Sequence, residues 1–350
     1  MAPLERLRNF LKTSHLDGIF IQSATSVRYF TGFTGGESLL YVDQKKQLII
    51  TDSRYTLQVK QQAPESEICE HKTGFWPEVA KLQMGKHLAL EGAYFSFNDY
   101  MALKRVLPGV TWQSVDLTSF RQVKSAPELR LLKKAVEISD QAFAKLLPNI
   151  KAGRTEKELA AELEYNMRRL GSDEVAFSTI VASGVRSALP HGVASEKRVE
   201  KGDFLTFDFG ATYQGYRSDI TRTLVVGKAA YWQKEIYDIV LAANLLGEKV
   251  LKPGRTGLEV DKAVREFITD KGYGTYFGHG LGHGVGLDIH ELPVLNTRNK
   301  QPLPKGAVVT IEPGIYIPCK GGVRIEDTVV ITEQGCEKLT ATAKELLEIN

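Results

Sequence analysis

Four acidic residues occupy matching places in two similar stretches of this 350-residue chain. Asp208 lies six residues after the glycine of a Lys-Gly pair that opens the apolar segment FLTFD, and Glu312 lies six residues after the glycine of a Lys-Gly pair that opens AVVTIE. A second acid follows each of them, two residues before a threonine: Asp219 in the first stretch and Glu326 in the second. Four carboxylates in one place would repel one another, and a pair of divalent cations removes that cost. The pattern therefore predicts a two-metal site suited to hydrolysis.

Burial decides between this prediction and a plainer one. A single acid at the end of a strand is usually a solvated turn residue. The segments FLTFDFG and VVTIEPG are apolar enough to be buried, however, and a buried acid must be paired or metal-bound. The matching register in two copies favours the metal site.

Three of the seven histidines lie in the glycine-rich stretch GHGLGHGVGLDIHE: His279, His283 and His290. The spacing of the first two would suit one face of a helix, but the alternating glycines disfavour a helix and predict an extended backbone packed closely against a neighbour. A carboxylate-rich two-metal site usually takes at least one imidazole. His191, in the loop sequence SALPHG, is a fourth candidate. The residues alone leave open which of the four binds metal.

A duplicated unit must position these side chains. Residues 151–155 read KAGRT and residues 252–256 read KPGRT, and each motif is expected to join two helices. The second helix of each pair begins with a capping threonine followed three residues later by glutamate. Each copy is thus a helix pair followed by a β-hairpin, and packing of the copies about a pseudo-two-fold axis would bring the four carboxylates together at its centre.

The first third of the chain has a different pattern. The segments LDGIFIQ, ESLLYV, QLIITD and KHLALEG predict strands that alternate with helices, as in an α/β domain whose mixed sheet is covered on both faces. Ser125 and Glu128 form a capping box that opens a new helix. We therefore expect an amino-terminal domain over residues 1–123 and an α+β catalytic domain over residues 124–350.

Composition excludes several classes of protein. Lys+Arg 45 against Asp+Glu 42 is too balanced for a nucleic-acid-binding protein, and no apolar stretch is long enough to span a membrane or to act as a signal peptide. The three cysteines form no CxxC motif, which favours the reducing cytoplasm. Neither HExxH nor GxSxG is present.

The motifs as a set resemble the pita-bread metallopeptidases of the proline-specific branch, the prolidases (Xaa-Pro dipeptidases) and aminopeptidases P. The resemblance covers almost the whole chain and rests on the following motifs, in this order: VRYFTGFTG, ITDSRY, SALPHG, DFG, SDITRT, HGLGHGVG, LDIHE, TIEPGIY and GVRIEDTVVIT. The first two are typical of a creatinase-type amino-terminal domain. The duplication described above is what the pita-bread fold would produce.

The resemblance implies a role for each candidate residue. It implies five metal ligands: Asp208, Asp219, His283, Glu312 and Glu326. The residues that match Asp219 and Glu326 bridge both metals in such enzymes. Those that match His191, His279 and His290 contact substrate or stabilise the tetrahedral intermediate. Arg324 and Tyr316 match a pair that supports a ligand carboxylate from behind.

The implied reaction is hydrolysis of the Xaa-Pro bond of a dipeptide, with a metal-bridging hydroxide attacking the carbonyl, Glu312 transferring the proton and His290 stabilising the oxyanion. We expect two divalent ions, manganese first, with cobalt and zinc as alternatives. The resemblance also implies a homodimer that acts on an Xaa-Pro dipeptide or short peptide.

Other functions on this fold remain as alternatives. Aminopeptidase P uses the same chemistry on longer Xaa-Pro peptides, and a chain of 350 residues favours the dipeptidase. Methionine aminopeptidase lacks the first domain. A creatinase-like hydrolase and a protein-binding module have lost the metal ligands, which are all present here.

Overall fold

The computed structural model describes residues 2–349 and divides the chain into two compact units, Met1–Arg121 and Gln122–Asn350. The division falls two residues before the boundary expected from the sequence. Ser125 caps helix α6 (Ala126–Leu146), and Glu128 bonds back to the Ser125 amide at 2.8 Å, so the expected helix start is confirmed. No helix within residues 2–349 is long and apolar enough to cross a membrane.

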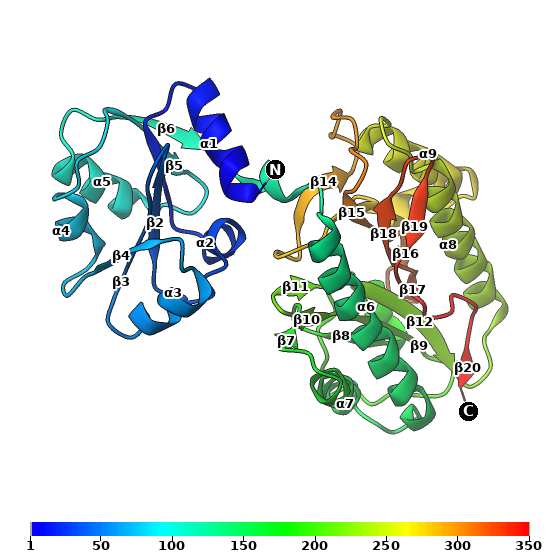
Figure 1. Ribbon diagram of the computed structural model, residues 1–350. Coiled ribbons are helices and arrows are strands. Elements are labelled where there is room, and N and C mark those ends of the chain that lie inside the picture. Colours follow the sequence, from blue (N-terminus) through cyan, green and yellow to red (C-terminus); the bar gives the residue numbers. More distant parts are fainter. Residues whose placement is uncertain (1, 350) are drawn as a thin grey trace. The chain divides into compact units, whose positions relative to one another are not determined.

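The amino-terminal unit is built on a six-stranded mixed sheet with the strand order β4-β3-β2-β1-β5-β6. Figure 1 shows helices on both sides of it, and the central strands are buried on both faces, so the expected α/β architecture is confirmed. Its strands are β1 (Gly18–Ile21), β2 (Leu39–Asp43), β3 (Gln47–Thr51), β4 (Glu67–Glu70), β5 (His87–Glu91) and β6 (Thr111–Val115). Its helices are α1 (Pro3–Thr13), α2 (Ala24–Thr31), α3 (Thr56–Gln62), α4 (Phe75–Val79), α5 (Phe97–Val106) and the 3-10 turn η1 (Thr118–Arg121).

The carboxyl-terminal unit contains two similar halves. The first half consists of α6, η2 (Leu147–Asn149), α7 (Glu156–Arg169), β7 (Glu174–Val175), β8 (Ile180–Ser183), η3 (Gly184–Ala188), β9 (Phe204–Phe209), β10 (Ala211–Tyr213), β11 (Tyr216–Arg217) and β12 (Ile220–Val226). The second consists of α8 (Tyr231–Val250), α9 (Gly257–Asp270), η4 (Gly274–Tyr276), β13 (Gly282–Gly284), β14 (Glu291–Leu295), β15 (Val308–Ile311), β16 (Gly314–Ile317), β17 (Gly321–Arg324), β18 (Asp327–Ile331), β19 (Cys336–Lys338) and β20 (Glu348–Ile349).

The same local rules build both halves. The amide of Thr155 donates to Glu158 at 2.8 Å at the start of α7, and the amide of Thr256 donates to Glu259 at 2.7 Å at the start of α9. Each helix pair is followed by an antiparallel strand pair, β9 with β12 in the first half and β15 with β18 in the second. The predicted duplication is therefore confirmed.

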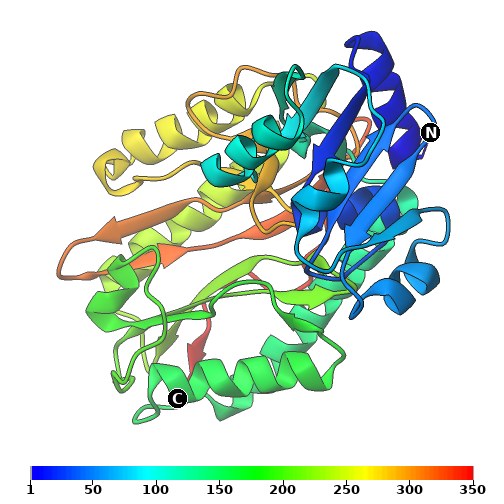
Figure 2. The ribbon, with the colours of Figure 1, turned by 90° about the vertical axis from the view of Figure 1, so that its left-hand side faces the viewer.

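Two hydrophobic clusters pack the helices against the strands, one mainly in each half. In the first, Phe143 of α6 stacks on Phe209 of β9, with ring centroids 5.3 Å apart. In the second, Val264 of α9 belongs to a cluster with Val309 and Ile311 of β15. Figure 2 shows the strands of the two halves between the two helix pairs.

Candidate metal centre

The four acids lie at the ends of the two central strand pairs. Asp208 is in β9, and Asp219 directly precedes β12; Glu312 directly follows β15, and Glu326 directly precedes β18. The backbone amide of Glu326 donates to the carbonyl of Thr221 at 3.2 Å, which joins the two strand pairs. One end of each hairpin therefore faces the other, as the duplication predicts.

His283 joins the acids from the neighbouring strand β13. Its Nε2 lies 3.5 Å from Asp219 Oδ2 and 3.3 Å from Glu312 Oε1, while its Nδ1 is 3.1 Å from the carbonyl of Gly284. Ligand atoms of Asp219, His283 and Glu326 all lie within 4.8 Å of one another. A donor set of carboxylate oxygens with one imidazole suits a divalent ion such as manganese.

Close backbone packing explains the alternating glycines around His283. A Cβ at Gly282 would lie 2.1 Å from the carbonyl oxygen of Thr310, and one at Gly284 would lie 2.4 Å from that of Leu292. The extended, closely packed stretch predicted from the glycine pattern is therefore confirmed for β13. Only glycine lets this strand approach its neighbours closely enough to bring His283 to the carboxylates.

Asp208 supplies a separate test of whether the site fits metal ions. Its Oδ2 accepts a hydrogen bond from Arg324 Nη2 at 2.7 Å, whereas its Oδ1 is buried and receives no hydrogen bond within residues 2–349. A buried carboxylate oxygen without a partner carries a large desolvation cost. A cation at Oδ1 would remove that cost, so the residues present fit a metal ion here.

The pKa values of the clustered acids also favour a metal site. Burial raises the pKa of Asp219 well above its ordinary value, and the charges of Glu326, Asp208 and Glu312 raise it further. Burial and neighbouring carboxylates likewise raise the pKa of Glu326, and burial raises that of Glu312. These acids share a buried cluster with the positive charge of Arg324. Divalent cations would relieve the repulsion that raises their pKa values.

Arg324 connects several parts of the site. Besides Asp208, its guanidinium donates to Thr221 Oγ1 at 3.0 Å, to the hydroxyl of Tyr316 at 2.8 Å and to the carbonyl of Pro190 at 3.2 Å. Burial raises the pKa of Tyr316 to about 12, so its hydroxyl stays protonated. One arginine thus fixes a carboxylate, a phenol and the loop that carries His191.

Two of the remaining histidines have defined contacts in the site. His279 Nε2 is 2.9 Å from the hydroxyl of Tyr316, and burial lowers the pKa of this imidazole, which keeps it neutral. The ring of His290 lies 4.3 Å from that of His283, and its side chain is exposed. Burial and the nearby His283 lower the pKa of His290, with a smaller contribution from His191.

The structure thus brings together all the residues singled out in the sequence, with His191 connected the least directly. His191 is exposed and follows Pro190, whose carbonyl Arg324 holds. Its place beside the centre therefore depends on the loop backbone. His15, His71 and His87 belong to the amino-terminal unit.

Sequence reasoning missed the hydroxyl groups of the site. Thr221 donates to Glu326 Oε2 at 2.7 Å, and Thr310 donates to Glu312 Oε1 at 3.0 Å. The signal for Thr221 was present, since a threonine follows each second acid by two residues, but it served only to align the two halves. Nothing in the spacing marked Thr310.

Comparisons with known proteins agree with this geometry. Residues 130–333 match the model of metallopeptidase family M24, and residues 3–123 match that of the creatinase/prolidase N-terminal domain. The chain is 42% identical to the Xaa-Pro dipeptidase of Pyrococcus furiosus over 98% of this chain and 99% of that protein.

Two solved structures are similar over 99% of both chains. The Xaa-Pro dipeptidase from Bacillus anthracis has 45% sequence identity and a TM-score of 0.96, and the X-Pro aminopeptidase from Thermotoga maritima has 43% identity and a TM-score of 0.93. With its matched domains, its duplicated fold and its carboxylate-histidine cluster, this chain belongs to metallopeptidase family M24.

Proposed function

We propose that this protein is a two-metal Xaa-Pro dipeptidase whose ions are held by Asp208, Asp219, His283, Glu312 and Glu326. The observation that carries the proposal is the convergence of Asp219, His283 and Glu326 from three separate strands or strand ends. They lie next to a buried oxygen of Asp208 that has no hydrogen bond to any residue the structure describes. A purely structural cluster would pair this oxygen with a donor.

The metal ions would polarise the scissile carbonyl and lower the pKa of a water molecule. Manganese suits the oxygen-rich donor set best, and cobalt and zinc are the alternatives. The chain's own residues supply the rest. Glu312 carries a carboxyl group at the centre of the site, where it can accept the proton of the attacking water and deliver it to the leaving nitrogen.

The histidines and Arg324 have complementary roles in this proposal. His290 lies beside His283 with an exposed side chain, so it can donate a hydrogen bond to a substrate oxygen that becomes negative. The ring of His279 is held by Tyr316, so it is preorganised to contact substrate. His191 follows Pro190, whose carbonyl Arg324 holds, so the loop backbone places its exposed side chain for substrate contact. Arg324 keeps Asp208 and Tyr316 in place behind them.

The assignment of proline specificity rests on the similarity to relatives. The proteins from Pyrococcus furiosus and Bacillus anthracis bear the name Xaa-Pro dipeptidase, and both are similar to this chain over nearly its whole length. Proline has no backbone N–H for ordinary recognition of the second residue, so a peptidase for this bond needs a dedicated pocket. We assign that substrate class to this chain.

The second candidate is an aminopeptidase that removes the first residue from longer Xaa-Pro peptides. The similarity to the Thermotoga maritima X-Pro aminopeptidase favours it. The two activities share the same chemistry and differ in whether the site accepts residues beyond the proline.

One experiment separates the candidates. The purified protein is assayed with a proline dipeptide and with its tripeptide extension, first with Mn²⁺ and then with a chelator. Chelator-sensitive cleavage of the dipeptide alone supports the dipeptidase, and comparable cleavage of both supports the aminopeptidase. Cleavage of neither, with metal bound, would contradict the assignment of proline substrates.

Two further properties complete the proposal. The cysteines Cys69, Cys319 and Cys336 are all free, which supports residence in the reducing cytoplasm. A homodimer follows from the family resemblance, and light scattering of the purified protein tests it directly.

A further inference from the structure

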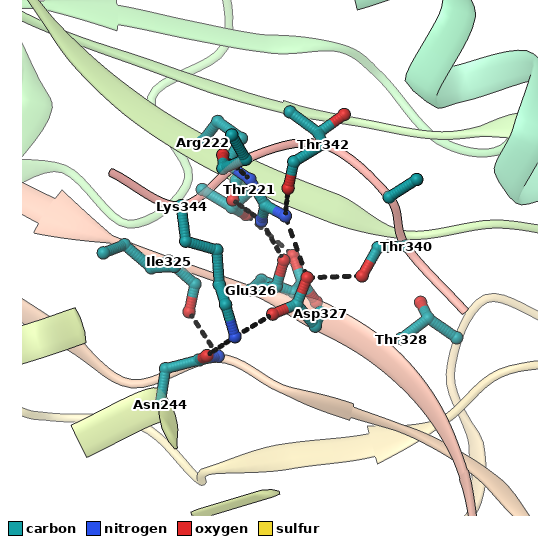
Figure 3. A network of polar contacts seen from close by, with 12 residues as sticks. Thr221, Arg222, Asn244, Ile325, Glu326, Asp327, Thr328, Thr340, Thr342 and Lys344 are labelled. Carbon is teal, nitrogen blue, oxygen red and sulfur yellow. Dashed lines mark hydrogen bonds and ion pairs between the residues drawn. The ribbon is translucent and has the colours of Figure 1, made fainter. Parts of the chain in front are cut away.

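A buried network of charges lies directly behind the proposed metal centre. It includes Asp327, which follows the proposed ligand Glu326, and two cations, Arg222 of β12 and Lys344 near the carboxyl end (Figure 3). Lys344 belongs to the segment 340–344, which we call the carboxyl-terminal strap. Nothing in the sequence motifs pointed to this segment.

Asp327 is fully buried and is held from two directions. Arg222 Nη2 lies 2.8 Å from Oδ1, and Lys344 Nζ lies 2.8 Å from Oδ2. The hydroxyl of Thr340 also donates to Oδ1. Adjacent residues at the start of a strand point to opposite faces, so Glu326 can face the metal centre while Asp327 faces the strap.

Arg222 connects the strap to the backbone of the metal centre. It donates to the carbonyls of Thr221 and Glu326 on one side, and to those of Thr342 and Ala343 in the strap on the other. The backbone of Glu326 is therefore fixed through its own carbonyl as well as through the side chain of its neighbour.

Lys344 extends the connection to the second half's helices and strands. Its ammonium group donates to Asn244 Oδ1 at 2.7 Å and to Glu248 Oε1 at 2.9 Å, both on α8. Asn244 in turn donates to the carbonyl of Ile311 at 2.8 Å, one residue before Glu312, and to that of Ile325 at 3.3 Å, one residue before Glu326. Figure 3 shows Asn244 between Lys344 and Ile325.

We propose that the strap is a positioning element of the metal centre, in which Lys344 fixes the backbone next to Glu312 and Glu326 through Asn244 and Asp327. This inference rests on the proposed metal-binding function. Ligands of a two-metal site must be held at a fixed separation, and residues that orient ligands from behind affect metal affinity without touching the ion. The strap does this from a part of the chain that supplies no proposed ligand.

The test is Mn²⁺ binding by isothermal titration calorimetry on chelator-treated protein. Lys344→Met keeps an unbranched apolar side chain, one atom shorter, and removes the ammonium group. We expect Mn²⁺ affinity to fall by about 10- to 100-fold, the usual range for residues that orient metal ligands. The matched control is Lys234→Met, which removes an exposed ion pair that also ties α8 to the carboxyl end, at 3.1 Å from Glu348. It should bind Mn²⁺ like the wild type.

A second variant separates positioning from general destabilisation. Lys344→Met leaves a buried negative charge, and Lys344→Met with Glu248→Gln restores the charge balance while Asp327 still lacks its ammonium partner. We expect this double variant to unfold near the wild-type temperature without metal and still to bind Mn²⁺ weakly. Wild-type affinity in the double variant would overturn the proposal.

The outcomes also distinguish this inference from the proposed function. Tight Mn²⁺ binding in both wild type and Lys344→Met overturns the positioning role alone. Absence of Mn²⁺ binding in the wild type overturns the ligand assignment, and the inference falls with it. An equal loss of affinity in Lys234→Met and Lys344→Met would also overturn it, because Lys234 pairs with Glu348, which supplies no proposed ligand.

Discussion

The hydroxyl of Thr221 donates a 2.7 Å hydrogen bond to the carboxylate of Glu326, across the contact between the two halves of the catalytic unit. The hydroxyl oxygen of Thr221 also accepts a hydrogen bond from Arg324 Nε at 3.0 Å. Thr221 is fully buried and lies opposite Asp208 in the β9–β12 pair. A threonine of the first half therefore orients an acid and an arginine of the second.

This relationship predicts the effect of Thr221→Val, which preserves shape but removes the hydroxyl. A buried guanidinium donor and a carboxylate oxygen lose their partner, and such losses cost about 1–3 kcal/mol. We expect Mn²⁺ affinity to fall by about tenfold or more, because Glu326 is no longer oriented. Calorimetric titration with Mn²⁺ measures the affinity.

Thr206→Val is the matched control for this substitution. Thr206 is a buried threonine of β9 whose hydroxyl contacts Thr223 at 3.0 Å rather than a proposed ligand. The Thr206→Val variant should be less stable than the wild type, with little change in Mn²⁺ affinity. Equal affinities for Thr221→Val and the wild type would show that the hydroxyl does not orient Glu326.

Asp219→Asn tests the electrostatic account of the site. The raised pKa of Asp219 means that its ionisation opposes folding once the pH exceeds the unfolded-state value, so the metal-free protein carries this cost at pH 7. We therefore expect the metal-free variant to melt at a higher temperature than the metal-free wild type. With Mn²⁺ present, the order should reverse, because the variant has lost a proposed bridging ligand.

Differential scanning fluorimetry with chelator and with Mn²⁺ provides both comparisons. Metal-dependent peptide hydrolysis should be abolished in Asp219→Asn while the fold is retained. Near-normal turnover, or a lower melting temperature without metal, would contradict the assignment of Asp219 as a buried bridging ligand.

Local sequence signals predicted the elements that carry the site. The capping pairs at Thr155 and Thr256 depend on residues only three positions apart, so the sequence predicts where these helices begin. The internal duplication aligns the four acids, so the sequence also predicts that they occupy equivalent places. Strands β4 and β6 were missed because they are edge strands with mostly exposed or half-buried side chains, which leave no apolar run.

Contacts between residues far apart in the sequence could not be predicted in the same way. The Thr221–Glu326 pair forms only when the two halves pack, and no spacing rule relates its residues. The Lys344–Asp327 pair forms within the second half, between strand β18 and a later segment, and no spacing rule relates its residues either. The orientation of Asp208 likewise depends on packing: one oxygen is bonded to Arg324, and the other has no hydrogen bond among the described residues. The sequence predicted which acids would come together, and packing determines which residues contact them.

His290→Ala distinguishes a catalytic role from a ligand role. The ring of His290 packs beside that of His283 but is exposed, so its removal should leave the proposed ligands in place. We expect kcat to fall by about 10²- to 10³-fold, the usual effect of losing one oxyanion donor, while the Mn²⁺ content stays unchanged. Metal analysis beside steady-state kinetics gives both values. A matching loss of metal would make His290 a ligand.

Asp327 gives a prediction for acid stability. Burial raises the pKa of its carboxyl, but the charges of Arg222 and Lys344 outweigh burial and lower the pKa to about 2. A lowered folded-state pKa stabilises the protein above the unfolded-state pKa of about 4, and this contribution is lost as the pH falls towards 2. The contribution at pH 7 is on the order of 2 kcal/mol.

The comparison of the wild type with Asp327→Asn isolates this contribution. Urea denaturation of the metal-free proteins should show a large difference in the free energy of unfolding at pH 7. The difference should shrink between pH 4 and pH 2, as the wild-type carboxyl becomes protonated. A difference that is independent of pH would assign the loss to altered packing rather than to charge.

The ion pair between Lys124 and Glu291 leads to the last prediction. Lys124 Nζ lies 2.6 Å from Glu291 Oε1, both side chains are 1% exposed, and Glu291 directly follows His290. Removing one partner of a buried pair leaves an uncompensated charge, so Lys124→Met should cost about 3–5 kcal/mol in urea denaturation. Lys124→Met with Glu291→Leu should recover most of that stability, because an apolar pair of similar volume is often as stable.

Turnover decides whether this pair also fixes His290. The double variant is expected to fold but lacks the Lys124–Glu291 ion pair at the start of β14. We therefore expect its kcat to be lower than that of the wild type, while its Mn²⁺ binding is normal. Lys157→Met is the control, since its pair with Glu196 is exposed and such pairs contribute about 0–1 kcal/mol. Wild-type kcat in the double variant would restrict the Lys124–Glu291 pair to stability, and the position of His290 would then depend on its packing against His283.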